Sequence, residues 1–207
     1  MAGVLRIGVL ASARGSNLQA ILDAAREPSY PARVAVVISD RETATALDRA
    51  RQAGVPAVFM NPKDFGDRPA YEAALSAELA ARQVGLVCLA GFMRLLGPAF
   101  VAAWSGRILN IHPSLLPAFP GLAPQRQALE HGVRVTGATV HFVNEGVDSG
   151  PIVLQEAVPV EPDDTEATLS ARILTTEHRL YPQAIRLFAQ ARLQITGRRV
   201  VIRQAAL

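Results

Sequence analysis

Short apolar runs alternate with segments of helical periodicity along the first half of the chain. Apolar runs of four to eight residues predict strands that are buried on both faces, and positions repeating every three or four residues predict helices. The expected strands are 5–10, 33–38, 57–59, 86–90 and 107–111, and the expected helices are 17–26, 42–53, 68–82 and 98–103. This regular alternation predicts a parallel sheet with helices on both faces.

The pattern changes in the second half. Two longer strands, 137–143 and 151–160, are separated by a polar turn, which predicts an antiparallel pair. A long helix over 165–191 follows, and 193–203 resembles strand with a turn at Thr196-Gly197. The expected fold class is therefore α/β: a Rossmann-like, open, mostly parallel sheet with helices on both faces and antiparallel strands toward the C-terminal edge.

Composition narrows the class of protein. The chain has 207 residues, 50% hydrophobic and 19% charged, which favours one compact globular domain. The net charge is only +3, with basic residues spread along the chain, so we expect no nucleic-acid partner. The single cysteine, Cys88, lies in an apolar run and predicts a buried, inert thiol in a reducing cytoplasm. We expect neither a signal peptide nor a membrane span.

The segment 11–17 joins the first strand to the first helix. Ligands bind at this edge of an open α/β sheet, and Gly15 permits a tight turn there. Ser16 or Asn17 is expected to cap the helix, whose free N–H groups attract phosphate. The segment lacks the Lys-Ser/Thr ending of a P-loop and the G-x-G-x-x-G of a dinucleotide site, so a plain capped turn is the alternative.

Asn110 and His112 are two residues apart at a strand end, which places both side chains on one face. Pro113 and Pro117 then stop regular structure and stiffen the backbone. An amide and an imidazole held side by side suggest an active site. The alternative for His112 is a histidine satisfied within the core.

The other candidate side chains are less distinctive. Asp148 lies in a loop flanked by glycines, and nothing in its distance along the chain from His112 predicts contact. His141 suggests a structural hydrogen bond in a strand, or support for the site. Ser114 lies only two residues after His112, an awkward geometry for a Ser-His-Asp hydrolase, and no G-x-S-x-G elbow is present. No spacing of ligands predicts a metal site.

Several motifs together resemble one enzyme family over nearly the whole length. The chain is similar to the glycinamide ribonucleotide (phosphoribosylglycinamide) formyltransferases of purine biosynthesis. The resemblance is carried by Gly15-Ser16-Asn17-Leu18-Gln19-Ala20, Leu89-Ala90-Gly91-Phe92-Met93-Arg94, 110–117, 139–143, Asp148-Ser149-Gly150-Pro151, Glu177-His178 and Tyr181-Pro182.

The resemblance implies a role for each matching position. The implied catalytic residues are Asn110, His112 and Asp148. The implied nucleotide-binding residues are Gly15, Ser16, Asn17 and Glu177. The implied folate-binding residues are Arg68, Met93, Arg94, Leu95, Leu96, Asn110, Asn144, Glu145, Gly146, Val147 and Asp148.

It also implies the reaction. A formyl group would pass from 10-formyltetrahydrofolate, the co-substrate, to the amine of glycinamide ribonucleotide. Asn110 and a protonated His112 would donate hydrogen bonds to the formyl oxygen as negative charge develops on it. Asp148 would favour the charged imidazolium and raise the pKa of His112. We expect a cytoplasmic monomer or homodimer that uses no metal and binds no nucleic acid or membrane.

We expect a single formyltransferase domain over 1–207, with a nucleotide-binding half, 1–111, and a folate-binding and C-terminal half, 112–207. Alternatives are a methionyl-tRNA formyltransferase or a formyltetrahydrofolate hydrolase, which carry further domains that we do not expect here, or a non-catalytic nucleotide-binding module. The chain departs from the family pattern at Ala13, where glycine is usual, and at Ala123-Pro124-Gln125, where histidines are often found.

Overall fold

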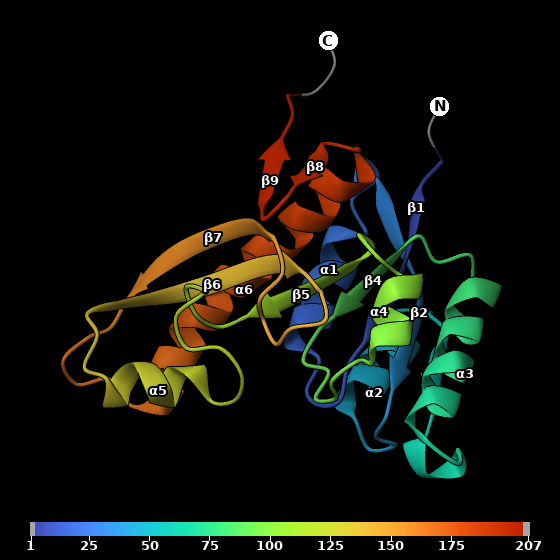
Figure 1. The fold of residues 1–207 in the computed structure, drawn as a ribbon, viewed down its shortest axis with the longest axis horizontal. Helices are drawn as coiled ribbons and strands as arrows, with labels where there is room; N and C mark the ends of the chain where they lie inside the picture. The colour runs from blue at the N-terminus through green and yellow to red at the C-terminus, as the bar shows by residue number, and fades with distance from the viewer. Residues whose placement is uncertain (1–2, 205–207) are drawn as a thin grey trace. The chain divides into compact units, whose positions relative to one another are not determined.

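The computed structural model describes residues 3–204 and divides into two compact units. Unit 1 ends at Leu109 and unit 2 begins at Asn110. The strand β5 (Ile108–His112) runs across this division, so its last three residues belong to unit 2. The elements of each unit are labelled in Figure 1.

Unit 1 contains four parallel strands that pair in the order β3-β2-β1-β4. They are β1 (Leu5–Leu10), β2 (Ala32–Ser39), β3 (Ala57–Phe59) and β4 (Leu86–Leu89). The residues of β4 are all buried, as are most of β1 and β2. Covered strands of this kind are typical of a parallel sheet with helices packed on it. Cys88 is fully buried in β4, in agreement with its prediction as a buried thiol.

The connections of unit 1 are mainly helical. They are α1 (Ser16–Ala24), α2 (Thr45–Gln52), a short 3-10 helix η1 (Pro62–Asp64), α3 (Arg68–Ala81) and α4 (Pro98–Ala103). Helix α2 begins three residues later than predicted. Residues 41–44 form a turn instead, in which the Ala44 N–H donates to Arg41 O, and the Ser39 hydroxyl exchanges hydrogen bonds with the Arg41 backbone.

Unit 2 contains an antiparallel pair, β6 (Val135–Phe142) and β7 (Ile152–Pro159), as predicted. A terminal hairpin of β8 (Leu193–Thr196) and β9 (Arg199–Ile202) extends this sheet through a parallel bridge from β9 to β7. Parallel strands in unit 1 and antiparallel strands toward the C-terminal edge confirm the predicted α/β class.

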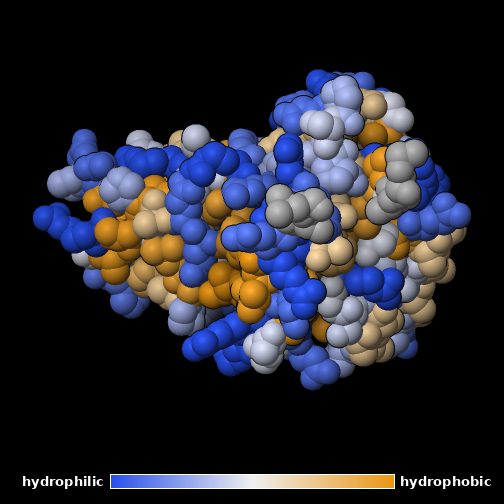
Figure 2. All heavy atoms as spheres, turned by 90° about the horizontal axis from the view of Figure 1, so that it is seen from above, coloured by the Kyte–Doolittle hydropathy of each residue, from blue (hydrophilic) through white to orange (hydrophobic). Residues whose placement is uncertain are grey.

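Two helices complete unit 2. The long helix α6 (Glu166–Ala189) packs on β6 and β7 and begins with a capping box at Thr165. Helix α5 (Pro124–Glu130) contacts α6, and the sequence predicted only its end near His131 and no range for it. Its seven residues are too few for a clear helical period. Figure 2 shows apolar residues gathered over the left and central part of one face, with hydrophilic residues around and between them.

Candidate active site

The turn between β1 and α1, together with the start of the helix, carries three predicted nucleotide-binding residues, Gly15, Ser16 and Asn17. Gly15 is the N-cap of α1 and adopts a left-handed conformation with φ 69°. The helix has no side-chain cap, so the expectation that Ser16 or Asn17 would cap it is wrong. Backbone N–H groups at a helix N-terminus without a side-chain cap are suited to bind an anion such as phosphate.

This loop is held against the start of α2. The Ala46 N–H donates to Ala13 O at 3.1 Å, and Arg49 Nε donates to Arg14 O at 2.9 Å. A Cβ atom at Gly15 would lie 2.8 Å from Ala46 Cα, closer than side chains pack. Glycine is therefore required at position 15 both by its backbone conformation and by this close approach. Alanine at position 13 takes part in the same contact through its carbonyl.

The loop after β4 lies beside the loop after β1. Its Met93 N–H donates to the Ser12 hydroxyl at 2.9 Å, and the Ser12 N–H donates to Gly91 O. Met93 and Leu95 are 60% and 68% exposed, which is unusual for large apolar side chains. The guanidinium of Arg94 lies over the ring of Tyr71 in α3, 5.5 Å from its centroid. The predicted folate residues of unit 1 thus gather around this loop and α3.

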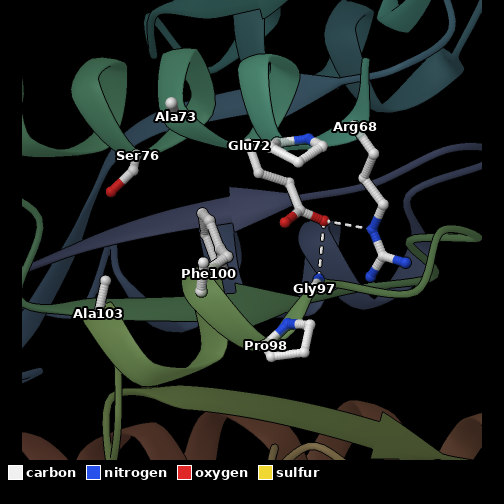
Figure 3. A pocket seen from close by; sticks show the side chains of 10 residues that line it. Arg68, Glu72, Ala73, Ser76, Gly97, Pro98, Phe100 and Ala103 are labelled. Carbon is white, nitrogen blue, oxygen red and sulfur yellow. Dashed lines mark hydrogen bonds and ion pairs between the residues drawn. The ribbon is translucent and has the colours of Figure 1, made fainter.

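Arg68, the first residue of α3, stands at one end of a cavity of 370 Å³ between α3 and α4. The walls are mainly small or apolar, and Figure 3 shows Phe100 and Ala103 from α4 facing Ala73 and Ser76 from α3. Arg68 Nε donates to Glu72 Oε1 at 2.8 Å. These two residues supply the charged groups of the cavity lining.

In unit 2, the last residues of β5 present the predicted amide and imidazole. Asn110 is partly buried, and His112 is 5% exposed. Both side chains approach Asp148, whose contact with them was not predicted from spacing. Asn110 Nδ2 lies 3.4 Å from Asp148 Oδ1, and His112 Nδ1 lies 3.3 Å from Asp148 Oδ2. The three residues implied as catalytic are therefore close neighbours.

Asp148 is the centre of this group. Besides the two contacts from β5, its Oδ2 accepts the Gly121 N–H at 2.8 Å, and its Oδ1 lies 3.6 Å from His141 Nε2. Burial raises the pKa of Asp148, but the side chain of His141, the Gly121 N–H and the nearby His112 together lower it below its ordinary value. The carboxylate is consequently ionised near neutral pH.

The protonation of His112 is set by opposing effects. Burial lowers its pKa, whereas the Phe119 carbonyl and the Asp148 carboxylate raise it, and the net pKa lies below the ordinary value. The expectation that Asp148 raises this pKa is correct for that interaction, but burial outweighs it. Both ring nitrogens face oxygen atoms, because Nε2 lies 2.9 Å from Phe119 O. Only the doubly protonated ring can donate to both of them.

His141, on β6, is a further member of the site. Its Nδ1 donates to Phe142 O at 2.9 Å, which leaves Nε2 to accept from Asn110 Nδ2 at 3.2 Å in the neutral ring. The residue is 2% exposed and touches two members of the trio. The sequence suggested either a structural hydrogen bond or support for the site. The structure contains both, the first to Phe142 O and the second to Asn110.

The segment after β5 is fixed by a polar network that sequence reasoning missed. The buried Thr139 hydroxyl donates to Ser114 O at 2.7 Å and accepts from the Leu116 N–H at 3.1 Å. Gln155 Nε2 donates to both Leu116 O and Thr139 Oγ1. Thr139 and Gln155 are paired across β6 and β7, and this pairing depends on the strand register rather than on a sequence motif. This network positions the residues that lead to Phe119 and Gly121.

The remaining predicted residues lie elsewhere in unit 2. Glu177 is buried in α6, 6% exposed, so the predicted nucleotide-binding residues are divided between the two units. The predicted folate loop, Asn144–Asp148, ends in a left-handed Asp148 with φ 47°. The segment 123–125, where the family often has histidines, forms the N-cap and first turn of α5.

The described residues contain neither a metal-binding cluster nor a membrane-spanning helix. Across residues 3–204, no group of three or more His, Cys, Asp or Glu side chains could hold a metal ion. No helix in this part of the chain is both long and apolar enough to span a membrane.

Comparisons with known proteins identify the family that has this fold and this group of side chains. The formyl transferase family matches residues 5–185. The chain therefore belongs to the formyl transferase family, which confirms the resemblance seen in the sequence.

Several relatives carry a more specific description. Phosphoribosylglycinamide formyltransferase of Escherichia coli is 47% identical over 191 residues, covering 92% of this chain and 90% of that protein. The human trifunctional purine biosynthetic protein adenosine-3 is 49% identical over 190 residues. This chain spans only 19% of the length of that protein.

Solved structures give the same picture. Glycinamide ribonucleotide transformylase 1 from Symbiobacterium toebii superposes with a TM-score of 0.95 at 62% identity, covering 97% of this chain and 95% of that one. A formyltetrahydrofolate deformylase from Pseudomonas syringae superposes with a TM-score of 0.90 at 26% identity, and covers 98% of this chain but 67% of that one. The fold is thus shared by proteins described as a transformylase and as a deformylase.

Proposed function

We propose that the protein transfers the formyl group of 10-formyltetrahydrofolate to the amine of glycinamide ribonucleotide, as a phosphoribosylglycinamide formyltransferase of purine biosynthesis. The observation that carries the proposal is the contact of Asp148 with both Asn110 and His112. The similarity to enzymes of that name over almost the full chain supports the choice of substrates.

The chemistry follows from this arrangement. The substrate amine attacks the formyl carbon, and negative charge develops on the formyl oxygen in the tetrahedral intermediate. Asn110 Nδ2 and a protonated His112 donate hydrogen bonds to that oxygen, which stabilises it most when the charge is greatest. A proton passes from the attacking amine to the leaving nitrogen of the folate, through His112 or an ordered water. No covalent formyl-enzyme is required.

The resting contacts must change for this to happen. His112 Nε2 is engaged with Phe119 O, and Asn110 Nδ2 with His141 and Asp148. The formyl oxygen therefore has to replace Phe119 as the acceptor for His112. Asp148 keeps its contact with Nδ1 and stabilises the imidazolium during this exchange.

The binding roles form a second part of the proposal. Gly15, Ser16 and Asn17 bind the phosphate of the nucleotide at the N-terminus of α1, and Glu177 binds its ribose. The folate contacts are proposed for Arg68, Met93, Arg94, Leu95, Leu96, Asn110, Asn144, Glu145, Gly146, Val147 and Asp148. The anionic glutamate of the folate is the natural partner of Arg68, because a guanidinium binds a carboxylate in a fork. Cytoplasmic location, one domain and a monomer or homodimer stay predictions.

The deformylase superposition makes hydrolysis the competing function, with water as acceptor. The test is to supply purified protein with 10-formyltetrahydrofolate and either glycinamide ribonucleotide, initiator methionyl-tRNA or buffer alone. We expect tetrahydrofolate to form only with the ribonucleotide. Formate release in buffer alone would support hydrolysis, and transfer to the tRNA would support the tRNA enzyme.

A further inference from the structure

Glu72 is a buried carboxylate with no part in the proposed chemistry. It lies in the first turns of α3, with its side chain 8% exposed. Its Oε1 accepts two hydrogen bonds of 2.8 Å, one from Arg68 Nε and one from the buried N–H of Gly97 (Figure 3). Burying a carboxylate is costly unless it is paired and hydrogen-bonded, and both conditions are met here.

The second bond ties the carboxylate to α4. Gly97 is the N-cap of that helix and has no side chain that could cap it. The Glu72 carboxylate, which belongs to α3, instead accepts the Gly97 N–H at the positive end of the helix. A Cβ atom at Gly97 would lie 2.6 Å from Glu72 Oε2 and 3.3 Å from Arg68 Nη2. The carboxylate and the guanidinium are therefore seated directly against the backbone at position 97.

The first bond fixes the orientation of Arg68. Glu72 takes only Nε, and among the described residues no hydrogen bond from either terminal nitrogen, Nη1 or Nη2, is present. These two nitrogens form an edge that binds a carboxylate through two parallel hydrogen bonds. An exposed arginine otherwise samples many rotamers, and ordering it on binding reduces affinity.

We infer that Glu72 is a positioning residue that holds the Nη1–Nη2 edge of Arg68 ready for the carboxylate end of the formyl donor, and so sets a preference for donors that carry this carboxylate. The inference rests on the proposed function for the identity of the donor. It adds Glu72, a residue that the proposed folate contacts do not include. Glu72 acts through Arg68 and does not itself touch the ligand.

The experiment compares two ligands that differ only at this end. Equilibrium dissociation constants are measured by calorimetry, under reducing conditions, for tetrahydrofolate and for tetrahydropteroate, which lacks the glutamate. The measured quantity is the ratio of the two constants. We expect the wild type to prefer tetrahydrofolate, and Glu72→Ala to lower this preference about tenfold, as for the loss of a charge-assisted hydrogen bond.

Two further variants separate positioning from folding. Glu72→Gln keeps an oxygen acceptor for the Gly97 N–H and is expected to fold normally with an intermediate preference. In Arg68→Ala, adding Glu72→Ala should change the preference no further, because the two residues act as one unit. Glu78→Ala removes the other i,i+4 ion pair of α3, with Arg82, and serves as the matched control with the wild-type preference.

Three results would overturn the inference: equal weakening of both ligands by Glu72→Ala, additive effects in the double variant, or a wild type that does not discriminate. Binding is measured without turnover, so failure of the proposed function would be seen separately. It would show as a protein that binds tetrahydrofolate but transfers no formyl group to the ribonucleotide.

Discussion

Replacing Asp148 by asparagine tests the centre of the proposed mechanism. The substitution preserves shape and one oxygen acceptor for the Gly121 N–H, but removes the charge that lies 3.3 Å from His112 Nδ1. Two unit charges at that distance attract by about 5 kcal/mol at an effective dielectric constant of about 20, which sets an upper limit. Loss of one preorganised donor to an oxyanion typically costs about 3–4 kcal/mol. We therefore expect kcat to fall about 100-fold to 1,000-fold.

The pH dependence gives the sharper evidence. Asp148 raises the pKa of His112, so its removal lowers that pKa further below the ordinary value. The protonated fraction of His112 at neutral pH then falls, and the pH at which kcat is highest moves to lower values. The assay is the initial rate of tetrahydrofolate formation at saturating substrates across pH 5 to pH 9, a range of about four units around the histidine pKa.

A control variant separates this effect from a general change of charge. Glu166→Gln removes an exposed carboxylate of unit 2 that pairs with Arg126, and should leave the profile unchanged. An Asp148→Asn enzyme with kcat within about threefold of the wild type, or with an unshifted profile, would refute the role of Asp148 in charging His112.

Three other predictions concern binding and stability. Gly15→Ala should raise KM for the nucleotide at least about tenfold with little change in the folate KM, because left-handed strain of about 1–2 kcal/mol and the clash with Ala46 reshape the phosphate loop. Gly54→Ala, at the same φ of 69° but in open space, is the control in the same steady-state assay. Thr139→Val should lower the free energy of unfolding in urea by about 2–3 kcal/mol, since buried partners lose their hydrogen bonds, and a loss below about 0.5 kcal/mol would contradict the network. The difference in free energy of unfolding between wild type and Asp148→Asn should shrink as pH falls below 3.8, the ordinary Asp pKa. A carboxylate whose pKa is lowered in the folded state contributes stability that is lost when it is protonated. A difference that stays constant with pH in urea titrations would contradict this.

The strands and most helices could be predicted because they depend on local patterns. A buried parallel strand such as β4 is a continuous apolar run, and α3 and α6 carry clear periodicity and capping residues. The predicted start of α2 was wrong because a turn around Arg41 competes with the helix. No range was predicted for α5, because its seven residues make only about two turns and leave little periodic signal.

The site was predictable in part, for a physical reason. Asn110 and His112 share a strand, so their common face follows from the period of two. Asp148 reaches them from a loop after the next strand, and such a contact depends on folding rather than on spacing. The balance of effects on His112 also depends on burial, which the sequence does not give. The resemblance to a family supplied the third residue, and the structure supplies its distances.

The Asn110–His112–Asp148 group is proposed to transfer a formyl group to an amine. The most direct test follows a ¹³C-labelled formyl group from 10-formyltetrahydrofolate by NMR, with glycinamide ribonucleotide present, in the wild type and in His112→Ala. We predict that the wild type moves the label into a formamide on the ribonucleotide, one for each tetrahydrofolate formed, and that the variant does so at least about 100-fold more slowly. Label recovered as formate, or equal transfer by His112→Ala, would contradict it.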